Sequence, residues 1–197
     1  MSMWGESGPR PPVDHDLDPI LGAMQAAAEI SVACDAGAAW SLVSDIGRIG
    51  EFSPECVDAW WVDGFPAREV GGRFEGRNRV TDAHGTREWI RPCTVVAWRP
   101  EREFSWEVGD RFDGSPASRW TFRIRPDGDG IVLREEFQHV PDGITGVRLR
   151  IDRAPARAAD LIAERTAQLN EGIAQTLERM RRVLEGQDRD AVRSPVR

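Results

Sequence analysis

The sequence predicts an α+β protein in which a curved, seven-stranded antiparallel sheet surrounds one long C-terminal helix. Segments in which apolar and polar residues alternate, as in half-buried strands, follow one another along most of the chain. After residue 156 the apolar residues recur at every third or fourth position, which indicates an amphipathic helix. Eight Trp and seven Phe are present, and most occupy alternate positions of the predicted strands. An apolar hollow between the sheet and the helix is therefore expected.

Seven strands are predicted, and Gly, Pro and Asp mark the joins between them. In the first strand, over residues 27–34, the apolar Ile30 and Val32 alternate with polar or small residues. The other six are expected over 56–63, 72–81, 87–97, 102–108, 118–125 and 131–139. Turn-rich segments at 82–85 and 126–130 join neighbouring strands directly, without the crossover helices that a parallel sheet needs. An antiparallel meander is the simplest topology.

Two short helices are expected after the first strand, over 37–45 and 46–52. Their apolar residues are three positions apart, and Pro54 ends the second because the residue before proline is pushed out of the helical region. The long helix is expected over about 156–185, with Pro155 in its first turn. Its apolar stripe consists of Ile162, Leu169, Ile173, Leu177, Met180 and Leu184.

A single domain is expected over residues 25–186, with a flexible arm over 1–24 and a flexible tail over 187–197. The net charge of −7 and the pI of about 5.1 disfavour nucleic acid and anionic membranes as partners, because both are polyanions. No stretch approaches the roughly 18 apolar residues of a membrane span. No basic region followed by an apolar core opens the chain. A cytoplasmic monomer or homodimer is expected.

The chain contains no Lys and no Tyr, so all 26 basic residues are Arg. Schiff-base chemistry, covalently held pyridoxal phosphate and a phenolic acid or base are therefore excluded. Cys34, Cys56 and Cys93 form no CxxC pair, and the three His lack the spacing of metal ligands. No Gly-rich phosphate loop leads from a strand into a helix. We expect neither a metal site nor a cofactor, and we interpret the cysteines as buried small hydrophobic residues.

Eight aromatic residues are predicted to line the hollow and to bind a hydrophobic small molecule. Alternation along the strands places their rings on the face that carries the other apolar side chains. They are Trp60, Phe74, Trp89, Phe104, Trp106, Trp120, Phe122 and Phe137. The pattern leaves open whether Trp60 points inward or outward.

Four polar residues fall on the predicted inner face and are candidates for catalysis: Arg91, Asn78, Glu135 and His139. Inside an apolar hollow Arg91 would need a partner, and it could polarise a ligand carbonyl or stabilise an enolate. Ile90 favours the opposite register, in which Arg91 is exposed to solvent. Asn78 could orient a carbonyl or, as a satisfied buried amide, fix the register of its strand.

Glu135 and His139 share the inner face of the last strand, roughly 13 Å apart along it, so they cannot touch each other. Glu135 is expected to be a near neighbour of Arg91 in a structural ion pair, or to share a ligand with it. Alternatively, with its pKa raised by burial, it is a general base. His139 lies near the expected cavity mouth, where a surface or rim position competes with a catalytic role.

Three segments carry a resemblance to a known family. They are SDIGRIGEFSPEC (44–56), GGRFEGRNR (71–79) and CTVVAWRPEREFSW (93–106). In these segments the chain resembles the SRPBCC superfamily, and more narrowly its polyketide cyclase/dehydrase-like branch. The resemblance covers residues 27–186 and implies a START-like helix-grip fold whose cavity binds lipids, hormones or polyketides. The aromatase/cyclases of this kind use cavity Arg with Tyr and Trp, and since this chain has no Tyr, their catalytic residues are not transferred by position.

Three functions fit this pattern. In the first, the chain is a cyclase or dehydratase: the hollow folds a polyketide-like substrate, and the polar residues assist enolisation or loss of water. In the second, it is a noncatalytic carrier or sensor of a hydrophobic small molecule, and the polar residues only orient the ligand. A third option is an interaction module of the cochaperone type, with a shallow cavity and a functional outer surface.

Overall fold

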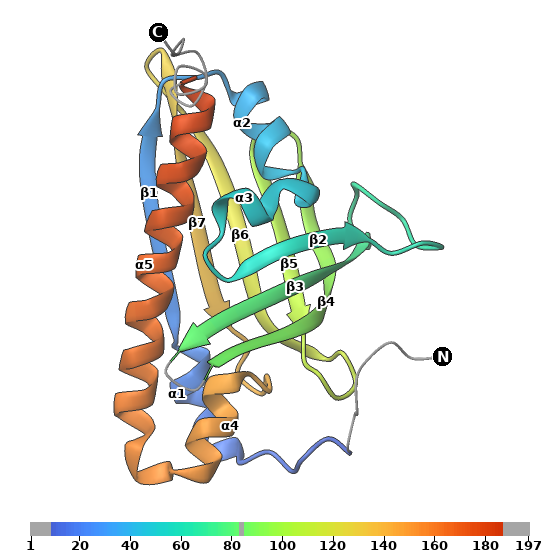
Figure 1. The fold of residues 1–197 in the computed structure, drawn as a ribbon, viewed down its shortest axis with the longest axis vertical. Helices are drawn as coiled ribbons and strands as arrows, with labels where there is room; N and C mark the ends of the chain where they lie inside the picture. The colour runs from blue at the N-terminus through green and yellow to red at the C-terminus, as the bar shows by residue number, and fades with distance from the viewer. Residues whose placement is uncertain (1–8, 83–84, 187–197) are drawn as a thin grey trace, which may run out of the picture.

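A curved antiparallel sheet wraps around the long helix α5 in the computed structural model, which describes residues 9–82 and 85–186 (Figure 1). The strands are β1 (Gln25–Val32), β2 (Cys56–Trp61), β3 (Arg73–Asp82), β4 (Gly85–Arg99), β5 (Glu103–Gly109), β6 (Pro116–Asp127) and β7 (Gly130–His139). The helices are α1 (Asp18–Gly22), α2 (Ala36–Val43), α3 (Ile49–Phe52), α4 (Gly146–Arg153) and α5 (Ala158–Leu184), with 3₁₀ turns over His15–Leu17, Ile46–Arg48 and Pro155–Arg157. The predicted α+β helix-grip fold is confirmed, including the two short helices after the first strand.

The sheet has the strand order β1-β7-β6-β5-β4-β3-β2, and every neighbouring pair is antiparallel. The strands from β2 to β7 form the predicted meander. β1 lies beside β7 rather than β2, because α2 and α3 carry the chain from one edge of the sheet to the other. The side chain of Asn170 on α5 accepts a hydrogen bond of 3.2 Å from the amide of Ala27, so the long helix is held on this edge strand.

The inner face of the sheet and one side of α5 form the hydrophobic core. Strand pairing places Phe104 opposite Phe122 and Trp106 opposite Trp120, so aromatic side chains form rows across the strands. The buried apolar residues of α5 are Leu161, Leu169, Ile173, Leu177 and Met180. Four of them belong to the predicted apolar stripe, so the period of this helix is predicted correctly from the sequence.

Local sequence explains the two short helices between β1 and β2. α2 begins after Asp35, whose carboxylate accepts a hydrogen bond of 2.8 Å from the amide of Ala38. α3 lies directly on β2, and Gly50 allows this contact, since a Cβ at that position would be 2.2 Å from the carbonyl oxygen of Val57. The close approach buries Phe52 in the core at the end of α3.

The last part of the predicted flexible arm packs against the folded domain. It contains α1 and the 3₁₀ turn before it, and Leu21 and Met24 are buried. A Cβ on Gly22 would lie 2.9 Å from Cγ of Pro141, so this segment fits closely on the loop after β7. Sequence periodicity does not reveal this because the segment is short and its partners are distant along the chain. The predicted tail over 187–197 and the first eight residues of the arm lie outside the described residues.

α4 is a helix that the sequence analysis does not predict. Apolar residues alternate with arginines over 147–151, which is the pattern of a strand. In the structure the buried residues of this segment are Val147, Arg148 and Ile151, a helical spacing, and Thr145 caps the helix by accepting from the amide of Arg148. The buried contacts of Arg148 decide for the helix against the local pattern.

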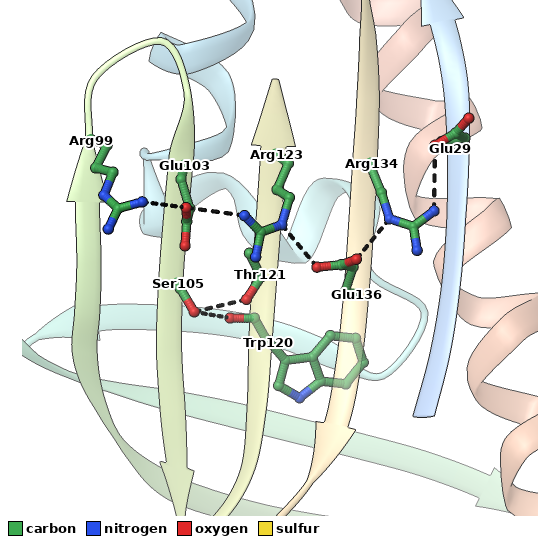
Figure 2. Close-up of polar contacts among 9 residues, drawn as sticks. All are labelled: Glu29, Arg99, Glu103, Ser105, Trp120, Thr121, Arg123, Arg134 and Glu136. Atoms are coloured by element: carbon green, nitrogen blue, oxygen red, sulfur yellow. Dashed lines mark hydrogen bonds and ion pairs between the residues drawn. The ribbon is translucent and has the colours of Figure 1, made fainter. Parts of the chain in front are cut away.

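The outer face of the sheet carries a row of alternating charges that crosses from β1 to β4 (Figure 2). The row consists of Arg99, Glu103, Arg123, Glu136, Arg134 and Glu29, with N···O distances of 2.7 to 3.3 Å. Arg123 pairs with both Glu103 and Glu136. Beneath the charges the hydroxyl oxygens of Ser105 and Thr121 are 2.8 Å apart and buried. The outer face is therefore held together by polar contacts that cover small hydroxyl residues.

Arg123→Met removes the middle of this row and both of its ion pairs. We expect the free energy of unfolding, measured by urea titration, to fall by about 1 kcal/mol, because half-exposed ion pairs contribute little. The loss should shrink in about 1 M NaCl, where charges are strongly screened. Arg48→Met, which removes a single exposed pair with Glu51 on α3, is the control and should cost less. An equal loss at both salt concentrations would show that packing of the Arg123 stem, and not its charge, stabilises the sheet.

Candidate functional site

The inner face of the sheet is lined by aromatic rings that touch one another. Ring centroids are 4.9 Å apart for Phe104 and Trp106, and 5.2 Å apart for Trp120 and Phe137. Seven of the predicted lining residues face this side: Phe74, Trp89, Phe104, Trp106, Trp120, Phe122 and Phe137. Trp89 and Trp120 are only partly buried, whereas the other five are buried.

Trp60 is the exception among the predicted lining residues. It lies opposite Glu75 on the outer face, and Trp61 takes the inner position. The Trp61 ring meets Phe74 edge-on, with centroids 5.6 Å apart. Trp98 is another inner residue that the sequence analysis misses. Its ring centroid is 6.4 Å from that of Trp61.

Two β-bulges cause these errors. The pairing register shifts between Cys56 and Asp58 in β2, and between Val95 and Ala97 in β4. Each bulge inserts one residue and so reverses which side chains point inward. Extending the alternation through the bulges therefore selects the wrong Trp in β2 and overlooks Trp98 in β4.

Glu135 lies on the inner face of β7, between Phe122 of β6 and Ala28 of β1. The residue is 5% exposed, and its Oε2 has no hydrogen-bond partner in the described part of the chain. Burial raises the pKa of Glu135 to about 8. The carboxyl group is therefore protonated at pH 7, and it offers a hydrogen-bond donor in apolar surroundings.

Arg91 shares the inner side of β4 with the buried Cys93. It is partly buried, and its Nη1 donates to the carbonyl oxygen of Ile90 at 2.8 Å. Burial lowers the pKa of Arg91, and the nearby Arg111 lowers it further. The predicted ion pair with Glu135 is wrong, because β5 and β6 separate the two strands and burial is the sole cause of the raised Glu135 pKa.

Asn78 and two cysteines surround Gly76 beside Arg91. Asn78 is partly buried, and its Nδ2 donates to the carbonyl oxygen of Gly76, two residues earlier on the same strand, at 3.2 Å. A Cβ on Gly76 would lie 3.5 Å from the sulfur of Cys56. Burial raises the pKa of Cys56 to about 11 and also raises the pKa of Cys93. Both thiols are therefore protonated at neutral pH and are poor nucleophiles.

His139 is not at a cavity rim, because its side chain is 0% exposed at the end of β7. Its Nδ1 is 2.6 Å from the carbonyl oxygen of Val140, and its Nε2 is 2.7 Å from the hydroxyl oxygen of Thr145. A carbonyl oxygen only accepts, so Nδ1 carries the hydrogen and the neutral Nε2 accepts from Thr145. Burial lowers the pKa of His139 and keeps the ring neutral. The histidine joins β7 to the start of α4, and this structural role replaces the rim position expected from the sequence.

A model of the polyketide cyclase/dehydrase and lipid transport family matches residues 24–185. The chain belongs to this family. Among curated proteins no match is found.

Solved structures of other proteins share the fold of this family member. The Polyketide_cyc-like protein Cgl2372 from Corynebacterium glutamicum is 28% identical, with a TM-score of 0.59 over 87% of this chain and 98% of that chain. The di-domain ARO/CYC StfQ from the steffimycin biosynthetic pathway is 12% identical, with a TM-score of 0.61 over 84% of this chain and 51% of that chain. Protein Ms6760 from Mycobacterium smegmatis is 16% identical, with a TM-score of 0.51 over 95% and 98% of the two chains. The last two likenesses show the fold alone.

Two pockets of this protein lie away from the inner face of the sheet. One, of about 120 Å³, is on the outer face beside Ser105 and Thr121. The other, of about 370 Å³, lies between the N-terminal segment, α4 and the loop that joins β5 to β6. On the inner face the aromatic rings touch, so a ligand there has to turn or displace side chains. The partly buried aromatic residues of this face include Trp61, Trp89, Trp98 and Trp120.

Within residues 9–82 and 85–186, no three His, Cys, Asp or Glu side chains are placed to hold a metal ion. The same part of the chain has no helix that is both long and apolar enough to cross a membrane. Asn78 and His139 are engaged in internal hydrogen bonds. The polar groups of the inner face that are best placed to meet a ligand are therefore Glu135 and Arg91.

Proposed function

We propose that the chain binds a hydrophobic, aromatic or polyketide-like small molecule on the inner face of the sheet, against α5. Membership of the polyketide cyclase/dehydrase and lipid transport family supports this, and so does the aromatic lining of that face. The observation that carries the proposal is the buried Oε2 of Glu135, which has no hydrogen-bond partner among residues 9–82 and 85–186. Because buried polar groups in proteins are nearly always hydrogen-bonded, this atom indicates a partner that arrives with the ligand.

The protonated carboxyl group of Glu135 sets the chemistry of that ligand. It can donate a hydrogen bond to a ketone, ester or enol oxygen, and the bond is stronger in apolar surroundings than in water. Leaving a buried donor or acceptor without its partner costs about 1 to 3 kcal/mol. A ligand with a carbonyl oxygen beside its aromatic rings is therefore preferred to a hydrocarbon of the same shape.

Cyclisation or dehydration of such a ligand is the catalytic form of this proposal. A neutral acid that donates to a carbonyl oxygen stabilises the negative charge that develops there during enolisation. Arg91 would add positive charge at the more open end of the same face. In this form Glu135 and Arg91 are the catalytic residues, and the inner face holds the flexible substrate in a reactive shape.

A noncatalytic carrier or sensor is the second candidate function. The internal hydrogen bonds of Asn78 and His139 favour it, because they leave few polar groups free to move protons. Native mass spectrometry of the purified protein would reveal a retained ligand, whether the protein is a catalyst or a carrier. Prolonged incubation then separates the two, since a cyclase or dehydratase converts the compound and a carrier releases it unchanged.

A matched pair of probes, 2-acetylnaphthalene and 2-ethylnaphthalene, tests the proposed site. We expect 2-acetylnaphthalene to quench Trp fluorescence with saturation at about micromolar concentration, an affinity of roughly 8 kcal/mol. The ethyl compound has the same shape without the carbonyl and should bind about tenfold more weakly, the effect of one unmade buried hydrogen bond. Glu135→Gln keeps a donor and should keep this preference, whereas Glu135→Leu should abolish it. Equal affinity for both probes in the wild-type protein would contradict the proposal.

A further inference from the structure

The pocket of about 370 Å³ lies at one end of the molecule, where three segments that are distant in the sequence meet. They are the N-terminal stretch over residues 9–12, the helix α4 and the loop over 110–115 that joins β5 to β6. Figure 1 shows the N-terminal stretch in dark blue, running below the orange α4. The volume is typical of small-molecule sites, and the described lining residues all lie outside the inner face of the sheet.

Two arginines hold the walls of this pocket together. Arg148 of α4 has a side chain that is 1% exposed, and its Nη2 donates to the carboxylate of Asp18, just after the N-terminal stretch, at 2.7 Å. Arg10 attaches the same stretch to the loop, since its Nη1 is 3.1 Å from the carboxylate of Asp113. Within the loop, Oδ1 of the buried Asp110 accepts from three backbone amides. The three walls are therefore joined in the folded chain, and the pocket is formed before any ligand arrives.

Most of the pocket wall is apolar. Proline has no backbone N–H, so the N-terminal stretch presents little that needs a hydrogen bond. Phe112 and Leu149 are half-buried and face the prolines from the other two walls. The apolar lining residues are Pro9, Pro11, Pro12, Phe112 and Leu149. A flat apolar ring would cover this surface and remove it from water, which favours binding.

Arg111 and Arg153 bring two guanidinium groups to the pocket. Both side chains are exposed, and within residues 9–82 and 85–186 neither has an acidic partner. The guanidinium carbon of Arg111 is 4.7 Å from the centre of the Phe112 ring, so this charge lies directly beside the apolar wall. Asp152 also lines the pocket, which leaves one positive charge in excess in a chain whose net charge is −7. The pocket therefore combines an apolar wall with positive charge that lacks a partner.

We propose that this pocket is a second ligand site and that it takes a small aromatic carboxylate. The aromatic ring packs against the prolines and Phe112, and the carboxylate accepts hydrogen bonds from Arg111 and Arg153. Asp152 repels a second negative charge, so a monocarboxylate is preferred to a phosphate ester or a dicarboxylate. The site is independent of the proposed function, because it uses neither Glu135 nor the inner face.

Methyl NMR of the full chain with labelled leucines tests the site, because Leu149 lines the pocket. Titration with 2-naphthoate at neutral pH should shift the Leu149 methyl signals with saturation and a Kd below about 1 mM. The signals of Leu177, which is buried in the core, should stay in place. 2-Acetylnaphthalene has nearly the same shape without the charge, so it should leave the Leu149 signals unchanged at the same concentrations.

Removing either guanidinium should weaken the binding of 2-naphthoate about fivefold, the effect of one exposed ion pair. Arg111→Gln and Arg153→Gln make these changes. Arg150→Gln is the matched control, since Arg150 belongs to the same helix as Arg153 but pairs with Glu164. Asp152→Asn removes the repelling carboxylate and should tighten binding about twofold. Raising NaCl from about 0.05 M to about 0.5 M should weaken binding to the wild-type protein about threefold.

Unchanged Leu149 signals in the wild-type protein during the 2-naphthoate titration would overturn the site. Equal shifts with 2-naphthoate and 2-acetylnaphthalene would show a merely apolar pocket and would overturn the proposal as well. Wild-type affinity in either arginine variant would have the same consequence. The inner-face site is tested separately by Trp fluorescence, so a failure of one site leaves the test of the other intact.

Discussion

Replacing Glu135 by Gln is expected to raise the free energy of unfolding at pH 8 by about 4 kcal/mol, with the gain fading towards pH 4. Burial raises the pKa of Glu135 from 4.5 to about 8. Between these two values the folded chain keeps a proton that the unfolded chain loses, so stability decreases as the pH rises through this window. Below pH 4.5 both states carry the proton and the cost disappears. Gln has the same size and is neutral throughout, so it removes the pH-dependent cost.

Urea unfolding of both proteins at several pH values between about 4 and 8 measures this difference. Glu136→Gln is the matched control, since Glu136 is the next residue of β7 but points outward to Arg123 and Arg134. Despite partial burial, hydrogen bonds to these arginines hold the pKa of Glu136 below its usual value, so its contribution is present at neutral pH and is lost in acid. The Glu136→Gln control should therefore lower the free energy of unfolding at neutral pH, which is opposite in sign to the effect of Glu135→Gln. Identical pH profiles for wild type and Glu135→Gln would show that the carboxyl group is not buried in its neutral form.

Ile173→Asp is expected to unfold the domain or to lower its Tm by more than about 10 °C. Ile173 is 1% exposed on the side of α5 that faces the sheet. Aspartate at this position would place an unpaired charge in the apolar core and remove the packing of a large side chain. The combined loss of at least about 4 kcal/mol is a large fraction of the stability of a typical domain. Leu169→Asp, on the same side of α5, should behave similarly.

Thermal unfolding followed by circular dichroism measures this effect. Ala174→Asp is the control because it adds the same charge to the next residue of α5, which is exposed to solvent. That variant should lose only the small difference in helix propensity between the two residues, well below 1 kcal/mol. A Tm for Ile173→Asp close to that of Ala174→Asp would contradict the packing of α5 against the sheet.

The sequence by itself determines the elements whose pattern is local. A period of two residues locates the strands and puts Phe104 and Phe122 on the inner face, as the structure confirms. A period near 3.6 residues locates α5 and identifies Leu169, Ile173 and Leu177 as core residues. These predictions succeed because burial of one face acts on every turn of a helix and on every second residue of a strand.

Only the tertiary structure decides the details on which the proposed site depends. Two bulges put Trp61 and Trp98 inside, because one inserted residue reverses a strand without leaving a mark on its composition. Strand order separates Glu135 from Arg91, and within the described residues its buried Oε2 has no hydrogen-bond partner. A strand-like pattern forms the helix α4, whose buried Arg148 bonds to Asp14 and Asp18, 134 and 130 positions away. Each of these features depends on contacts between distant segments, which form when the chain folds and leave no period in the sequence.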